Sequence, residues 1–294
     1  MDSMHDMSGG FAAMWSPGLF LILMIITYVY FQLIGPLRQR FAGSSEVKLG
    51  KKLLFVTSIV ILYIAQGSPI NYYSHGMIFS FHMFQQTLIY LILPPIFFIA
   101  MPDWLLRPVL MKAFVRKWIF PFTHPLIAGL LFNLLFSFYH IPLIFNYSFD
   151  HTFIHNTYHW VLAITAFMMW CPVFCTLPEW KRMSDFQKMG YVFFNGVLLT
   201  PACALIIFSD NLLYPAYVQG SQMINFVLPP IEDQQLGGTL MKIIQEIVYG
   251  VALAYIFFNW YRREKKKEED DEKEAFGEIT QRNPLHSSLA TSNN

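Results

Sequence analysis

The sequence predicts an all-α, polytopic membrane protein with seven transmembrane helices, its N-terminus outside and its C-terminus inside. Three observations support this prediction. Of the 294 residues, 55% are apolar and only 13% are charged, with a mean hydropathy of +0.41, which is too little charge for a soluble domain of this size. Seven apolar stretches are each long enough to cross a hydrocarbon core, which needs about 20 helical residues. Lys and Arg gather at alternate connections between these stretches.

The predicted spans follow one another with short connections. They cover residues 14–35, 53–70, 79–101, 119–145, 156–177, 189–208 and 239–260. The first has no basic residue before it and no small-residue cleavage site after it, so we expect an uncleaved anchor. We therefore divide the chain into an extracellular tail (1–13), a transmembrane domain (14–260) and a cytoplasmic tail (261–294). This last tail begins as a charged helix and ends in a polar segment of disordered composition.

Basic residues give the orientation, because Lys and Arg near the ends of spans stay on the cytoplasmic side. They follow spans one, three, five and seven: Arg38, Arg40, Lys48, Lys51, Lys52; Arg107, Lys112, Arg116, Lys117; Lys181, Arg182, Lys188; Arg262, Arg263, Lys265, Lys266, Lys267. The other connections contain no Lys or Arg before Lys242, which already lies inside span seven. The net charge of +1 argues against a nucleic-acid partner, which requires a basic face.

Histidines concentrate on the predicted outer side. In "DHTFIHNTYHW", His155 and His159 are four residues apart, so on a helix they lie one above the other on one face. His151 lies one turn higher, at the mouth, while His82 and His140 come from other spans at a similar depth. Polar groups in a bilayer usually face the bundle interior, so this convergence predicts a metal site. A hydrogen-bonded network around water or a quinone is the alternative.

The soft residues near these histidines favour Cu(I) over zinc, since thioethers select Cu(I) whereas imidazole suits several metals. Met83 follows His82, and "SHGM" contains His75 and Met77. The N-terminal tail adds three further candidates for copper loading, Met4, His5 and Met7. Cys171 and Cys175 share a helix face near the inner end of span five, where either simple packing or a Cu(I) or redox role fits. Cys203 is interpreted as a packing residue.

Two acids stand near the candidate site or inside a span. Asp233, in "EDQQLGG" before span seven, either accepts the N–H of a ligand histidine or caps a helix. Glu246 is predicted to be a buried acid that supports the site or couples to a proton.

Four motifs in order, "HMFQQ", "YHIP", "IHNTYHW" and "EDQQLGG", make the chain similar to the CtaG family of cytochrome c oxidase assembly factors, of the multi-span Bacillus type. The resemblance implies a bacterial plasma-membrane protein that handles copper for a haem-copper oxidase. It marks His82, His140, His155 and His159 as candidate ligands, with Asp233 and Gln234 as support. Many relatives have a histidine where this chain has Gln86, which leaves Met83 or His151 to complete the set.

The resulting hypothesis is a non-catalytic factor that binds Cu(I) in an outward-facing vestibule and passes it to oxidase subunits in the same bilayer. His5, His75 and His151 would form a relay from an extracellular copper donor. The rival is a zinc-dependent hydrolase of the ceramidase-receptor type, which would use His82, His155, His159 and Asp150. A histidine-box desaturase would need more cytoplasmic histidines than His124 supplies.

Overall fold

The computed structural model describes residues 14–221 and 228–282, and every regular element in these ranges is helical. Within them, six helices are long and apolar enough to cross a membrane, and a sharply bent helix pair makes up to seven. The spans are α2 (Pro17–Ile34), α3 (Leu49–Gly67), Phe79–Ala100, the bent pair Val115–Thr123 and Pro125–Tyr139, α10 (Thr152–Phe174), α11 (Asp185–Ile207) and part of α13 (Pro230–Arg282). The chain is therefore a helical membrane protein, as its composition predicted.

The third span contains a π-helical segment just before its proline pair. It consists of α5 (Phe79–Gln86), the π-helix η2 (Thr87–Ile92) and α6 (Leu93–Ala100). Pro94 has no N–H and cannot bond the carbonyl of Tyr90, four residues earlier. That carbonyl instead accepts the indole N–H of Trp170 on α10, at 3.1 Å. A neighbouring helix thus satisfies the freed backbone group, as a bilayer requires.

The fourth predicted span, 119–145, is broken into separate helices. The segment Val115–Thr123, which ends in the 3₁₀ helix η4 (Phe120–Thr123), meets α8 (Pro125–Tyr139) at 76°, and α9 (Pro142–Phe149) is a separate helix. Residues before proline avoid the helical region, and proline suits the first turn of a new helix. Accordingly, His124 and Ile141 both have extended backbone, with ψ of 129° and 125°.

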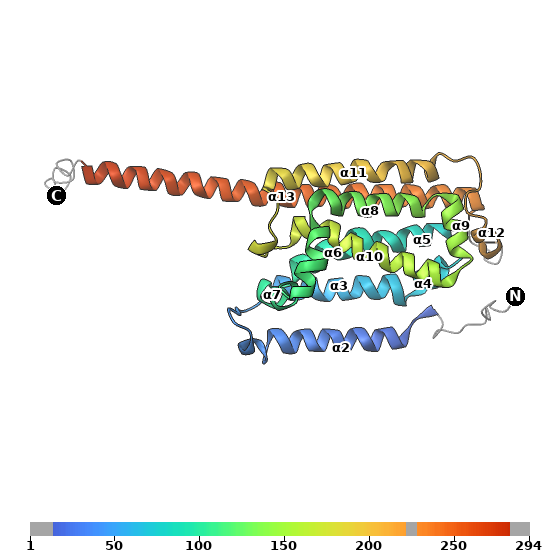
Figure 1. Ribbon diagram of the computed structural model, residues 1–294, viewed down its shortest axis with the longest axis horizontal. Coiled ribbons are helices and arrows are strands. Elements are labelled where there is room, and N and C mark those ends of the chain that lie inside the picture. Colours follow the sequence, from blue (N-terminus) through green and yellow to red (C-terminus); the bar gives the residue numbers. More distant parts are fainter. Residues whose placement is uncertain (1–13, 222–227, 283–294) are drawn as a thin grey trace, which may run out of the picture. The chain divides into compact units, whose positions relative to one another are not determined.

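The bundle in residues 14–249 has two ends, which we name by their residues. The basic end comprises residues 35–52, 101–124 and 174–190, with α7 (Asp103–Leu110). The histidine end comprises residues 66–90, 139–160, 208–221 and 228–234, with α4 (Pro69–Ser74), α9 and α12 (Ala216–Ser221). These two sets of short helices lie at opposite ends of the bundle (Figure 1).

At the basic end, cationic side chains bond carbonyl groups where helices finish. The Lys51 ammonium donates to the carbonyl of Met101 at 3.2 Å, and Lys188 donates to that of Val173 at 2.9 Å. Such cations complement the negative C-terminal ends of α6 and α10. The basic connections therefore also stabilise the helices that they join.

The described residues form two compact units, which divide after Tyr249. The second unit, as far as described, is the continuation of α13, which stays helical through the charged segment 261–274 to Arg282. Its exposed charges include a Lys267–Glu264 pair at 3.4 Å.

Candidate functional site

Three imidazoles meet at the histidine end. His82 comes from α5, and His155 and His159 come from α10. The ring centroids are 4.6 Å apart for His155 and His159, 5.5 Å for His82 and His159, and 6.4 Å for His82 and His155. Imidazoles that bind one ion through nitrogens about 2 Å away have centroids about 5 Å apart. The observed triangle is slightly wider than that arrangement.

Two tyrosine hydroxyls hold the α10 histidines in place. The Tyr139 hydroxyl lies 3.0 Å from Nε2 of His159 and 3.4 Å from Nδ1 of His155. The Tyr90 hydroxyl lies 2.9 Å from Nδ1 of His159, so both nitrogens of that ring contact a phenol. No group of three His, Cys, Asp or Glu side chains within residues 14–221 and 228–282 is arranged to hold a metal ion. A metal at this cluster would therefore have to replace phenol contacts and turn the rings.

Gln86 completes the contacts of His82. Its amide nitrogen lies 2.9 Å from Nε2 of His82, four residues earlier on the same helix, and its side chain is fully buried. Gln86 is thus bonded directly to a candidate ligand.

Asp233 on α13 caps the helix that carries His82. Its carboxylate accepts the backbone N–H of Phe79 at 2.6 Å and both the N–H and the hydroxyl of Ser80, at 3.3 and 2.5 Å. A carboxylate at a helix N-terminus satisfies unpaired N–H groups and complements the helix dipole. Of the two interpretations of Asp233, helix capping is the observed one, and it acts on α5 from a distant part of the chain.

Gln234 supports the adjoining loop. Its side chain accepts the N–H of Leu213 at 2.8 Å and donates to the carbonyl of Asn211 at 3.2 Å. In the same region the Tyr214 hydroxyl donates to the carbonyl of His140 at 2.7 Å, and burial raises the pKa of Tyr214 above its usual value. The Tyr214 phenol therefore remains a protonated donor at neutral pH. Through Gln234, the motif "EDQQLGG" holds the loop at the histidine end in place.

His140 and Met83 lie apart from the triangle. His140 is fully buried after α8, where Nδ1 contacts the Phe136 carbonyl at 2.8 Å and Nε2 has no partner among the described residues. Its ring contacts are with Phe136, Tyr139 and Phe145. Met83 faces α13, because a Cβ added to Gly237 would lie 3.0 Å from its Cγ.

The predicted loading residues are distributed along the rim. His75 is exposed, and its ring lies 6.0 Å from that of His155. His151 is exposed at the start of α10, with Nδ1 2.9 Å from the Tyr147 carbonyl. Met77 packs beside Gly220. Met4, His5 and Met7 lie outside the described residues.

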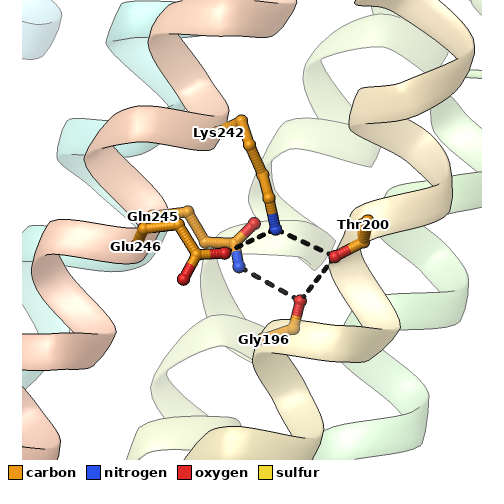
Figure 2. Close-up of polar contacts among 5 residues, drawn as sticks. All are labelled: Gly196, Thr200, Lys242, Gln245 and Glu246. Carbon is orange, nitrogen blue, oxygen red and sulfur yellow. Dashed lines mark hydrogen bonds and ion pairs between the residues drawn. The ribbon is translucent and has the colours of Figure 1, made fainter.

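The expectation of a buried acid at Glu246 is wrong. Its side chain is 61% exposed and pairs with Lys242, one turn earlier on α13, at 2.6 Å. Lys242 also donates to the Thr200 hydroxyl on α11 at 2.9 Å, and the neighbouring Gln245 amide donates to the Gly196 carbonyl at 3.1 Å (Figure 2). The sequence identified Glu246 as a charged residue inside a span but not Lys242 as its partner. Because Lys242 also bonds Thr200, Glu246 belongs to a contact between α11 and α13 and not to the histidine cluster.

The cysteines are buried and free. Cys171 lies in the last turn of α10 and Cys175 directly follows that helix, at the opposite end of α10 from the histidines. Asp150, which the hydrolase alternative requires, is exposed at the end of α9.

Residues 28–263 match the family described as cytochrome c oxidase caa3 assembly factor (Caa3_CtaG). The chain belongs to this family. No curated protein and no solved structure matches it. The family makes the oxidase its partner, and nothing in the comparison supports the hydrolase alternative.

The part matched to the Caa3_CtaG family includes the histidine triangle and Asp233 but not the tail with Met4, His5 and Met7. Sequence reasoning missed Tyr90 and Tyr139, which contact the triangle directly. Tyr139 stands beside His140 in "YHIP", so its motif was an available signal. Nothing in the sequence marks Tyr90, because its position depends on the π-helix and on the packing of α10.

Proposed function

We propose that this Caa3_CtaG member is a non-catalytic assembly factor of a bacterial plasma membrane that binds copper at the histidine end and passes it to cytochrome c oxidase. Family membership supports the oxidase assembly role. The observation that carries the copper role is the triangle of His82, His155 and His159. These imidazoles come from two helices, and their ring centroids lie within a few ångströms of the spacing that three ligands of one ion would have.

The chemistry of the triangle fits copper as cargo. Imidazole is a good ligand for copper, and among the residues that the structure describes the hydrogen-bond partners of the three rings are phenols and an amide, not carboxylates. Each of the three rings already has at least one nitrogen in contact with Tyr90, Tyr139 or Gln86, so copper that binds through these nitrogens must displace protein hydrogen bonds. Those bonds re-form when copper leaves, which favours release to an acceptor over permanent retention. Cu(I) is the form we propose, with zinc as the alternative metal.

The proposed orientation has the histidine end outside. Its support is the distribution of Lys and Arg, which gather at the basic end, where charge keeps loops on the cytoplasmic side. His75 and His151 would then meet copper first, at the exposed rim, before it reaches His155. An extracellular donor protein would supply the ion.

Competition between the purified protein and a chromogenic Cu(I) chelator tests the proposal. We expect one Cu(I) per chain, and we expect His155→Ala together with His159→Ala to abolish retention. His151→Ala is the matched control, since it removes an imidazole from the same helix start but not from the triangle. Retention of Cu(I) by the double variant, or stoichiometric binding of zinc in preference to copper, would contradict the proposal.

A further inference from the structure

A large cavity runs along the bundle beside the histidine triangle. Its volume is about 1000 Å³, and its walls come from α2 and α3 on one side and from α5, α6, α7 and α10 on the other. It extends from Gln66 and His75 at the histidine end to Leu106 and Leu110 at the basic end. This volume is at the upper limit of pockets that hold drug-sized ligands.

The lining of the cavity is uncharged. Among the described residues that form it, none is Lys, Arg, Asp or Glu, and the greater part is aliphatic or aromatic. An anionic head group, such as a phosphate or a carboxylate, would lose its hydration here without gaining a cation. The lining therefore selects an amphiphile whose polar head is neutral.

Polar side chains gather at one end of the cavity. These are Gln66, His75, His82, Gln85, His155, Asn156 and His159. Within the described chain, the side chains of Gln66 and Asn156 and the Nε2 atom of His155 have no hydrogen-bond partner, so they are free to bond a ligand. In the apolar part, by contrast, the Ser58 hydroxyl is bonded to the Phe55 carbonyl. The ring of Tyr30 stacks on Phe55, and its buried hydroxyl has no hydrogen-bond partner among the described residues. A polar head therefore finds most of its hydrogen-bond partners at the histidine end.

Aromatic rings stand at the same end, and one of them marks an opening. Tyr90 and Trp160 line the cavity together with the histidines. Trp160 lines the cavity although 71% of its surface is exposed, so the cavity opens sideways between helices where lipid would lie. A planar head that stacks on aromatic rings can enter this way from the bilayer.

We propose that this cavity binds an isoprenoid quinone, with its ring at the histidine end and its tail along α2, α3 and α6. A quinone ring is neutral and planar, its carbonyl groups accept hydrogen bonds from imidazole and amide donors, and its tail matches the apolar walls. The inference does not rest on the proposed copper role, because the free groups that it uses include Gln66 and Asn156.

The test is a titration of the purified, chelator-treated protein in nanodiscs with decylubiquinone, followed by tryptophan fluorescence. We expect saturable quenching at one quinone per chain, and we expect Trp160→Phe to remove most of the quenched signal. Ala163→Phe fills the cavity wall and should weaken binding about tenfold, as overpacking does. Leu62→Phe, on the facing wall, should act in the same direction.

Ile164→Phe is the matched control, because the neighbouring Ile164 is 51% exposed and does not line the cavity. It should bind decylubiquinone with unchanged affinity. Quenching that rises linearly with quinone, or equal affinity in wild type, Ala163→Phe and Leu62→Phe, would overturn the proposal. Displacement of the quinone by equimolar phosphatidylglycerol would overturn it as well, since the site would then be an ordinary lipid groove. None of these experiments uses copper, so a failure to bind quinone would leave the proposed copper role unaffected.

Discussion

The carboxylate of Asp233 on α13 accepts a hydrogen bond from the Ser80 hydroxyl on α5 at 2.5 Å, across 153 residues of sequence. The same carboxylate caps the backbone of α5, one turn before His82. The position of a candidate copper ligand thus depends on the last span of the bundle.

Asp233→Ala should destabilise the protein by about 1–3 kcal/mol, because it leaves buried N–H donors of α5 without an acceptor. Thermal unfolding in detergent measures this, and the copper affinity should fall as α5 loosens. Glu232→Ala is the control, since that neighbouring acid is exposed. Equal melting temperatures for the two variants would refute the capping role.

Tyr139→Phe should raise the copper affinity about fivefold, because copper would no longer displace a phenol contact worth about 1 kcal/mol. Chelator competition provides the measurement. Tyr158→Phe serves as the control, because its hydroxyl donates to the Leu135 carbonyl and not to a histidine. A large loss of affinity in Tyr139→Phe would instead show that the phenol orients the rings or binds the metal.

Gly237→Ala should lower the melting temperature, because the new Cβ would lie 2.8 Å from the Phe79 ring and overpack the α5–α13 contact. Gly190→Ala should raise it slightly, since Gly190 lies in α11 with no atom within 4 Å of an added Cβ, and alanine favours a helix by up to about 1 kcal/mol. A rise in both variants would contradict the close approach of α5 and α13.

Lys242→Met should destabilise the protein because it leaves Glu246 as an unpaired charge within a span. Adding Glu246→Gln should recover part of the loss, with a coupling of about 0.5–3 kcal/mol between the two sites. Melting temperatures of both single variants and the double variant give the coupling, and strictly additive effects would argue against it. Copper affinity should not change in any of them, because the pair contacts α11 and not the histidine triangle.

The span positions follow from hydropathy, because seven apolar stretches need a bilayer or a core and the chain has too little charge for a soluble surface. The bend at His124 was foreseeable in kind, since Pro125 follows it and a residue before proline avoids the helical region. Its 76° angle was not, because it depends on how α8 packs against its neighbours. For the same reason, the π-helix before Pro94 could not be read from the residues alone.

The helical spacing of His155 and His159 was enough to predict that they share a face, and their rings are in fact adjacent. Sequence depth was a poorer guide for His140. The sequence put it at a depth similar to that of the other histidines, but its ring turns toward Phe136, because α8 ends there and the chain bends into α9. Glu246 shows the same limit, as depth along a span does not say which side of the helix faces a partner.

X-ray absorption at the copper edge of the Cu(I)-loaded protein tests the central claim most directly. The account predicts two or three imidazole nitrogens at about 2.0 Å from copper, with no sulfur in the first coordination shell. A copper–sulfur shell would contradict it, since copper would then sit at the Cys171–Cys175 pair or on methionine and not at the histidine triangle.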